Sequence, residues 1–198
     1  LMIRRPPRST PLYSSAASDV YKRQNAHYVP RSHPKRDVPL EEFPLELWEL
    51  TIKSNLNGLF LMCQEIGKIM IKQKKGVIVN ISSIFGREYG GNSSSYMASK
   101  ASLIASTKHL AMECASNGIT VNSIAPGSIK HKGGSWEKFV NQNEKNIVDD
   151  FISANLPMGK FGSPEPVGDM VAFLCSELAF TVTGTCINID GGQGSSLI

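Results

Sequence analysis

Tyr96 and Lys100 are four positions apart in the segment Y-M-A-S-K, and Ser83 lies thirteen positions before the tyrosine. Residues four apart on a helix project from the same face, so the lysine ammonium would lie beside the phenol. A neighbouring cation lowers the pKa of a tyrosine, which is about 10 when unperturbed, toward neutral pH. With a serine hydroxyl to hold a substrate oxygen, these side chains predict a proton-transfer site for a carbonyl or an alcohol.

Alternating strands and helices are predicted around these three residues. The expected strands are short apolar runs that begin after glycines or close the chain, and they cover residues 77–81, 119–124 and 185–189. The expected helices cover residues 45–74 (with an adjustment around Asn57-Gly58), 96–116 and 165–177, with a polar helix from about Trp136. This alternation predicts an α/β fold with a parallel, doubly wound sheet.

Three further motifs accompany the tyrosine and lysine. They are G-V-I-V-N-I-S-S at 76–83, I-T-V-N-S-I-A-P-G at 119–127 and T-G-T-C-I-N-I-D-G-G at 183–192. In this order and spacing the chain resembles the single-domain subgroup of the short-chain dehydrogenase/reductase family, over residues 25 to about 192. The resemblance implies the C-terminal portion of a Rossmann fold, and an NAD(P)-dependent oxidoreductase that interconverts a secondary alcohol and a ketone by hydride transfer.

The resemblance also implies roles for individual residues. Tyr96 would be the catalytic acid/base, Lys100 would lower its pKa and hold the cofactor ribose, and Ser83 would position the substrate oxygen. Asn55 would hold a water in the proton relay. Ser82 competes with Ser83 and Asn57 competes with Asn55, and the family spacings favour Ser83 and Asn55.

Cofactor contacts are implied at the two ends of the matched region. The turn at Pro126-Gly127 and the backbone around Ile129 would meet the nicotinamide carboxamide, although Lys130-His131 stands where the family usually has a threonine. Asn25 resembles the remnant of a family N-N-A-G turn near the adenine ribose. Asp190-Gly191-Gly192 is interpreted as a structural turn.

The family's T-G-x-x-x-G-I-G phosphate loop is not found in this sequence. In the family, its glycines let the backbone approach the pyrophosphate at a helix N-terminus. The chain is therefore interpreted as an N-terminally truncated fragment that lacks the first strands, and is expected to be inactive as it stands. The choice between NAD and NADP cannot be made from the residues present, and the strand at 77–81 is expected to have an unpaired edge.

Residues 1–24 are Arg- and Ser-rich and show no apolar periodicity. They resemble translated sequencing adapter, with a disordered tail or an organellar transit peptide as the alternatives. The domain assignment is thus a non-native or disordered leader over 1–24 and a partial Rossmann-type domain over 25–198, with residues 1 to about 40 irregular.

Composition narrows the remaining function classes. The net charge of +4 arises from eight Lys or Arg against one acid up to Arg36, so the predicted domain gives no support for nucleic-acid binding. No metal-ligand spacing and no membrane-spanning run is seen, and the cysteines Cys63, Cys114, Cys175 and Cys186 are expected to be free thiols. A cytoplasmic protein is expected, with an organelle matrix as the alternative.

The predicted partners are a small-molecule alcohol or ketone and further copies of the chain. A homodimer or homotetramer of the full-length protein would pair the helix from Leu45 and the helix from Tyr96, whose Ala98, Ala101 and Ala105 form a smooth side. Two alternative functions are a catalytically silent dimerisation or binding module and a nucleotide-sugar epimerase or dehydratase. An enoyl reductase would need a tyrosine and a lysine seven residues apart.

Overall fold

The computed structural model describes residues 21–24, 33, 35, 38–90 and 94–196. Within these residues four parallel strands form one sheet in the order β1-β2-β3-β4. The strands are β1 (Tyr21–Gln24), β2 (Gly76–Ile81), β3 (Ile119–Pro126) and β4 (Cys186–Ile189). The expected α/β class and parallel sheet are confirmed.

The edge of β2 is paired, contrary to expectation. β1 runs parallel to β2, from Tyr21 beside Val77 to Gln24 beside Asn80. The prediction of an unpaired edge is therefore wrong, and so is the prediction that everything before about residue 40 is irregular. Strand edges present unsatisfied backbone donors and acceptors, which any extended segment can satisfy whatever its side chains. β1 also lies inside the segment that the sequence assigned to the leader.

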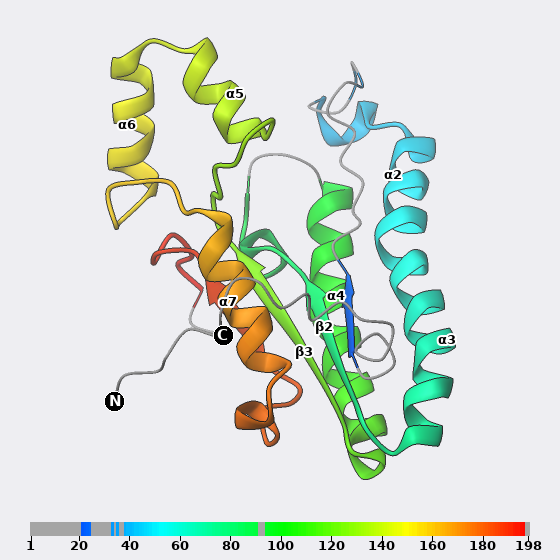
Figure 1. The fold of residues 1–198 in the computed structure, drawn as a ribbon. Coiled ribbons are helices and arrows are strands. Elements are labelled where there is room, and N and C mark those ends of the chain that lie inside the picture. Colours follow the sequence, from blue (N-terminus) through cyan, green and yellow to red (C-terminus); the bar gives the residue numbers. More distant parts are fainter. Residues whose placement is uncertain (1–20, 25–32, 34, 36–37, 91–93, 197–198) are drawn as a thin grey trace, which may run out of the picture.

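Alternation along the strands divides the core into two layers. Ile78 of β2 packs with α3 (Gly58–Gln73) and α4 (Ser94–Cys114), whereas its neighbour Val79 packs with α7 (Pro164–Leu174). Successive strand residues point to opposite faces, so a strand buried on both faces needs a continuous apolar run. Figure 1 shows α3 and α4 on one side of the sheet and α7 on the other.

The long helix expected over residues 45–74 is present, with one irregular turn. α2 (Leu45–Ile52) passes into a π-helical turn, η2 (Lys53–Asn57), and then into α3. A π turn carries one extra residue, so it rotates the helix on one side of it relative to the other. The buried face accordingly runs through Leu47, Thr51, Asn55, Leu59, Cys63, Gly67 and Met70, while Phe60, Met62 and Ile69 are exposed.

Residues 135–155 form two helices, where the sequence predicted one. α5 (Ser135–Gln142) ends at Asn143, which is extended, and α6 (Lys145–Asn155) follows. Trp136 packs against Phe139, Phe151 and Phe161 with ring centroids 4.9–5.7 Å apart, so this lobe has an aromatic core of its own. Figure 1 shows the two helices standing beyond the end of the sheet.

Short 3-10 turns complete the described structure. They are η1 (Leu40–Glu42), η3 (Ile84–Gly86), η4 (Ala115–Asn117) and η5 (Glu177–Ala179). α4 ends near Gly118, which has a φ of 69° as expected for a C-terminal cap. All four cysteines are free thiols, as predicted.

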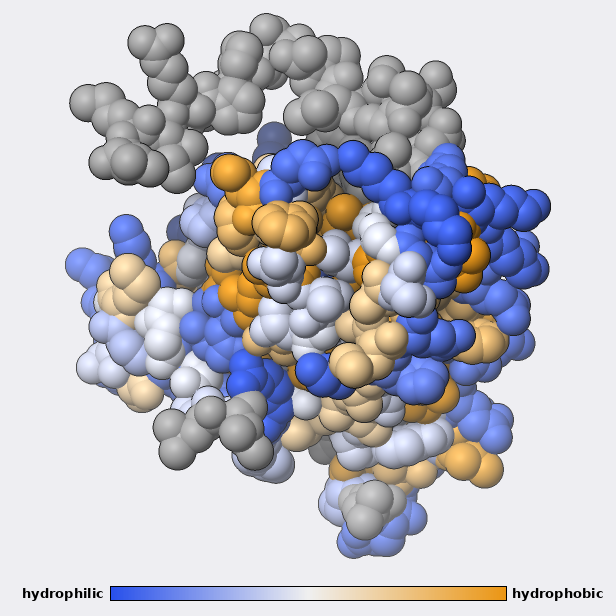
Figure 2. All heavy atoms as spheres, turned by 90° about the horizontal axis from the view of Figure 1, so that it is seen from below, coloured by the Kyte–Doolittle hydropathy of each residue, from blue (hydrophilic) through white to orange (hydrophobic). Residues whose placement is uncertain are grey.

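The surface seen from below Figure 1 mixes hydrophilic and hydrophobic residues (Figure 2). Leu178 and Phe180, at and just after η5, are 76% and 72% exposed.

None of the helices in the described ranges is both long enough and apolar enough to cross a bilayer.

Candidate active site

The predicted site residues converge on the carboxyl-terminal edge of the sheet. Ser83 follows the end of β2, and Pro126 is the last residue of β3. Parallel strands end at the same edge, where α/β proteins place their ligands. The first turns of α4, with Tyr96 and Lys100, lie against the segment that leaves β2.

Tyr96 and Lys100 share one face of α4. The Lys100 Nζ lies 5.7 Å from the centroid of the Tyr96 ring. It also donates a hydrogen bond of 2.8 Å to the carbonyl of Ile81, at the end of β2. Lys100 is only 3% exposed, while Tyr96 is half-buried. The ammonium is thus fixed between the strand end and the phenol ring.

Burial changes the acidity of this lysine. Desolvation of the ammonium lowers the pKa of Lys100 from 10.5 to about 8. Most copies still carry the charge at pH 7, because the pKa remains above that pH. A cation is therefore present beside Tyr96 at neutral pH.

The two neighbouring serines have different environments. Ser82 Oγ is buried and donates to the Lys100 carbonyl at 3.1 Å, so it joins the strand end to α4. Ser83 Oγ accepts a hydrogen bond of 3.3 Å from the Phe85 backbone N–H. Because Ser83 Oγ only accepts in this contact, its own hydroxyl hydrogen can still be donated to another acceptor. The structure therefore gives Ser82 a structural contact and leaves Ser83 as the candidate for a substrate oxygen.

Gly86 allows η3 to approach α4 closely. A Cβ on Gly86 would lie 2.8 Å from the Lys100 carbonyl carbon, 2.9 Å from its oxygen and 3.0 Å from Ser82 Oγ. Real Cβ atoms essentially never make such contacts, so a side chain at this position would force η3 and α4 to move apart. The missing side chain brings the loop after Ser83 onto the helix that carries Tyr96.

The two candidate asparagines are also distinguished. Asn55, in the π turn, is 3% exposed and its Nδ2 donates to Ser99 Oγ at 3.1 Å. Ser99 Oγ in turn donates to the Tyr96 carbonyl at 2.7 Å. Asn57 is exposed on another side of the turn. The geometry connects Asn55, and not Asn57, to the helix of the tyrosine.

Ser99 is a residue that the sequence reasoning missed. It is fully buried and joins Asn55 to the backbone of Tyr96. Its position three residues after the tyrosine places it close to the same helix face, and this was the only signal in the sequence.

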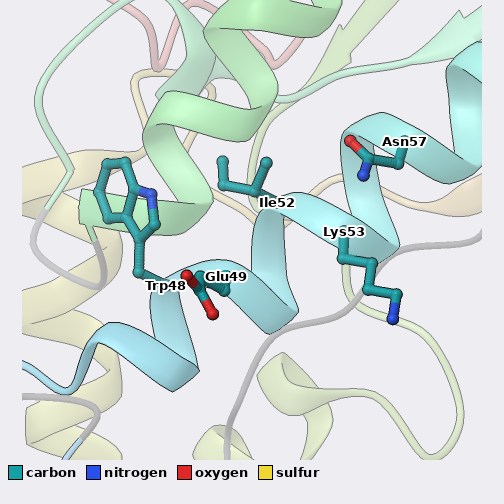
Figure 3. A pocket seen from close by; sticks show the side chains of 5 residues that line it. All are labelled: Trp48, Glu49, Ile52, Lys53 and Asn57. Atoms are coloured by element: carbon teal, nitrogen blue, oxygen red, sulfur yellow. The ribbon is translucent and has the colours of Figure 1, made fainter.

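A pocket of about 310 Å³ lies on α2 and η2, where Trp48, Glu49, Ile52, Lys53 and Asn57 line it (Figure 3). None of the predicted catalytic residues contributes to this lining. It is a separate surface feature.

The turn after β3 is fixed by backbone contacts. The N–H of Gly127 donates to the Ile189 carbonyl at 3.1 Å. Further on, the N–H of Lys130 donates to Gly162, and the N–H of Gly162 donates to Ser128. This bridge uses the backbone groups on either side of Ile129 and not those of Ile129 itself.

Asp190 accepts hydrogen bonds of 3.0 Å from the N–H groups of Gly192 and Gly194. Gly191 and Gly192 have φ values of 63° and 79°, which suit glycine. The segment is thus a turn stabilised by its own carboxylate, which agrees with its interpretation as a structural turn.

Asn25, the predicted adenine-ribose contact, lies outside the described residues. Among the described residues, no cluster of three or more His, Cys, Asp or Glu could hold a metal ion.

Comparisons with known proteins show which proteins this chain is similar to. A family model described as enoyl-(acyl carrier protein) reductase matches residues 25–193. The chain is 37% identical over 159 residues to a 3-oxoacyl-[acyl-carrier-protein] reductase of Synechocystis, which covers 80% of this chain and 60% of that protein.

Solved structures of reductases with this name are also similar to the chain. A 3-oxoacyl-[acyl-carrier protein] reductase from Brucella melitensis has a TM-score of 0.78 at 29% identity, covering 89% of this chain and 63% of that one. A second Brucella melitensis reductase of the same name, with bound NAD, has a TM-score of 0.77 at 28% identity, covering 89% and 62%. The chain spans 56–61% of the length of the first three curated relatives it matches.

Proposed function

Because the chain belongs to the short-chain dehydrogenase/reductase family, we propose that the whole protein is an oxidoreductase that uses NAD or NADP to interconvert a secondary alcohol and a ketone. One observation carries the proposal. The buried ammonium of Lys100 lies 5.7 Å from the ring centroid of Tyr96. Both lie at the sheet edge where β2, the strand before Ser83, and β3, which ends at Pro126, terminate. The four-residue spacing of the pair also favours carbonyl over enoyl reduction.

The residues present fit the nicotinamide end of the cofactor. Lys100 has three donors and gives one to Ile81, so others can reach ribose hydroxyls. The backbone of Ile129 is not used by the bridge to Gly162, which leaves it for the carboxamide. When bound, the nicotinamide would supply or accept the hydride. Asn25 is kept as the proposed contact near the adenine ribose.

The proton would be handled by this chain's own side chains. Tyr96 gives its phenol proton to the substrate oxygen in reduction and takes it back in oxidation. Lys100 stabilises the phenolate by its charge, and Ser83 donates its hydroxyl hydrogen to the same oxygen. Asn55 holds α4 through Ser99 and would also hold the relay water.

Substitution of Tyr96 tests this chemistry in the full-length protein. With a 3-oxoacyl thioester and NADH or NADPH, we expect Tyr96→Phe to lower kcat by about 10²- to 10⁴-fold, while the cofactor Kd stays nearly unchanged. Lys100→Ala should weaken both turnover and cofactor binding, since one ammonium serves both.

Tyr89→Phe is the matched control, because Tyr89 is 88% exposed and should keep full activity. Undiminished turnover in Tyr96→Phe would rule out the assigned chemistry. Full-length wild-type protein that binds neither nucleotide would instead indicate the catalytically silent module.

We also propose that the protein assembles as a homodimer or homotetramer through α3 and α4. Ala101 and Ala105 are exposed on α4, and Phe60, Leu61 and Met62 are 48–57% exposed on α3. Light scattering of the full-length protein should give at least twice the monomer mass. Ala101→Arg should lower that mass, whereas Ala154→Arg, on the exposed side of α6, should not. A monomeric wild-type protein would contradict the proposal.

A further inference from the structure

The segment that follows β4 contacts both loops that flank the candidate site. Gln193 Oε1 accepts a hydrogen bond of 2.8 Å from the backbone N–H of Ser128, just after the Pro126-Gly127 turn. Two residues later, the N–H and the hydroxyl of Ser195 donate to Glu88 Oε2, at 2.6 and 3.0 Å. Glu88 lies in the loop between Ser83 and Tyr96. One short segment therefore bridges the loop after β2 and the loop after β3.

The segment has a defined shape before it reaches these loops. The Asp190 carboxylate holds its turn through the N–H groups of Gly192 and Gly194. Arg87, next to Glu88, donates to Asn188 Oδ1 at 2.7 Å. The β4 end, the turn and the Glu88 loop thus form one hydrogen-bonded unit, and Gln193 is the side chain of that unit that reaches the Ser128 turn.

Close packing at Gly127 and Gly194 also holds the segment after β4 against its neighbours. A Cβ on Gly127 would lie 2.7 Å from Gln193 Oε1 and 2.8 Å from Asp190 Cβ. A Cβ on Gly194 would lie 2.9 Å from Asp190 Oδ2 and 3.3 Å from Glu88 Oε1. The turn at Gly127 therefore meets the segment with no space for a side chain, and the Glu88 loop packs tightly against Gly194.

We propose that Gln193 is a positioning residue, which fixes the Gly127–Ser128 turn so that the backbone of Ile129 faces the cofactor. Ser128 is 5% exposed, its carbonyl accepts from Gly162 and its N–H donates to Gln193. Both backbone groups that set the direction of the next residue are thus held. The cofactor part of this inference rests on the proposed function, whereas the contact itself does not.

The first test measures the contact without any activity. Amide hydrogen exchange of the 198-residue chain should show the Ser128 N–H protected in the wild type. Gln193→Met, which keeps the size but loses the oxygen, should raise its exchange rate about tenfold. Gln193→Glu keeps an acceptor and should restore the protection. Gln73→Met, on the surface at the end of α3, is the matched control and should leave Ser128 unchanged.

A Ser128 amide that exchanges freely in the wild type would overturn the inference without any variant, even if Gln193→Met failed to fold. So would equal exchange in the methionine and glutamate variants.

The second test uses the full-length protein and separates positioning from folding. Gln193→Met should raise the Kd for NADH or NADPH about tenfold and leave kcat at saturating cofactor within about threefold, and Gln193→Glu should rescue the affinity. Equal losses in both variants, or an unchanged Kd in Gln193→Met, would overturn the positioning role. If the wild type bound no nucleotide but Ser128 was protected through Gln193, the proposed function would fail while the contact stood.

Discussion

Lys100 is the residue at which burial and chemistry conflict most. The residue is 3% exposed, and its ammonium donates to one carbonyl and lies near one aromatic ring. No carboxylate is among these contacts, so the cost of desolvation is only partly offset, and the pKa falls to about 8. A buried cation that has no carboxylate partner within the described ranges favours a functional interpretation of this position.

The lowered pKa of Lys100 predicts how the stability of the fold depends on pH. Lys100 has a pKa of 10.5 in the unfolded chain and about 8 in the folded one. Between these values the unfolded state binds more protons, so the free energy of unfolding should rise with pH, by roughly 3 kcal/mol at most. Below pH 8 both states carry the proton and the full cost remains. Urea unfolding from pH 7 to 10 measures the slope.

Lys100→Met should lose this rise, because it has no group to titrate there. Lys108→Met, which removes an exposed lysine further along α4, should keep it. Parallel pH curves for the wild type and Lys100→Met would show that burial of Lys100 does not affect stability in this range.

At this scale the sequence predicted residue types better than contacts. The spacing of Tyr96 and Lys100 follows from helix geometry, so their shared face could be derived in advance. The choice of Asn55 over Asn57 and of Ser83 over Ser82 rested on family spacing, and the contacts of Ser99, Phe85 and the Lys100 carbonyl now support it. The bond between Asn55 and Ser99 joins residues 44 positions apart, which no local pattern reveals.

Among the elements, η3 and α4 approach each other closely beside the candidate site. η3 begins directly after Ser83, and Gly86 within it lies against the backbone of Lys100. The short loop therefore sets the distance between the serine and the helix of the tyrosine.

We expect Gly86→Ala to push η3 away from α4, because its Cβ would lie under 3.0 Å from backbone atoms that cannot rotate aside. In the full-length protein, turnover should fall at least about tenfold and the melting temperature should drop by several degrees, as for other overpacked sites. Gly168→Ala is the matched control. Its Cβ would meet nothing within 4 Å on α7, so it should be neutral or stabilising by up to about 1 kcal/mol.

Equal activity in Gly86→Ala and Gly168→Ala would show that the spacing of η3 and α4 does not control catalysis. Thermal unfolding and steady-state kinetics on the same samples give both readouts.

Elements with a clear hydrophobic pattern were predicted almost to the residue. The segment in which polar and aromatic residues are mixed was not. The strands at 77–81 and 119–124 are short apolar runs, and the structure extends them only to Gly76–Ile81 and Ile119–Pro126. Residues 135–155 carry many polar residues, and the break at Asn143 separates two helices whose Trp136 and Phe151 pack against each other. Aromatic contacts between two helices are tertiary, so hydrophobic periodicity within either helix does not predict them.

At the scale of the whole molecule, the sheet includes the strand β1, which lies in the segment that the composition assigned to the leader. β1 covers the outer edge of β2, whose own residues are mostly buried and apolar. An uncovered strand of that kind would pair with other chains. The composition of residues 1–24 gave no strand signal, since pairing uses backbone groups and does not require apolar side chains.

Two N-terminal deletions of this chain separate the alternatives. A chain that starts at Tyr21 keeps β1, so it should remain as soluble and as heat-stable as the 198-residue chain. A chain that starts at Asn25 loses β1 and leaves β2 with an open edge. We expect it to sediment as aggregate and to bind thioflavin T, because unpaired backbone groups on an apolar strand recruit other strands. Equal solubility and melting temperature in the two chains would show that Tyr21–Gln24 add nothing to the sheet, and the leader would then end at residue 24 as its composition indicated.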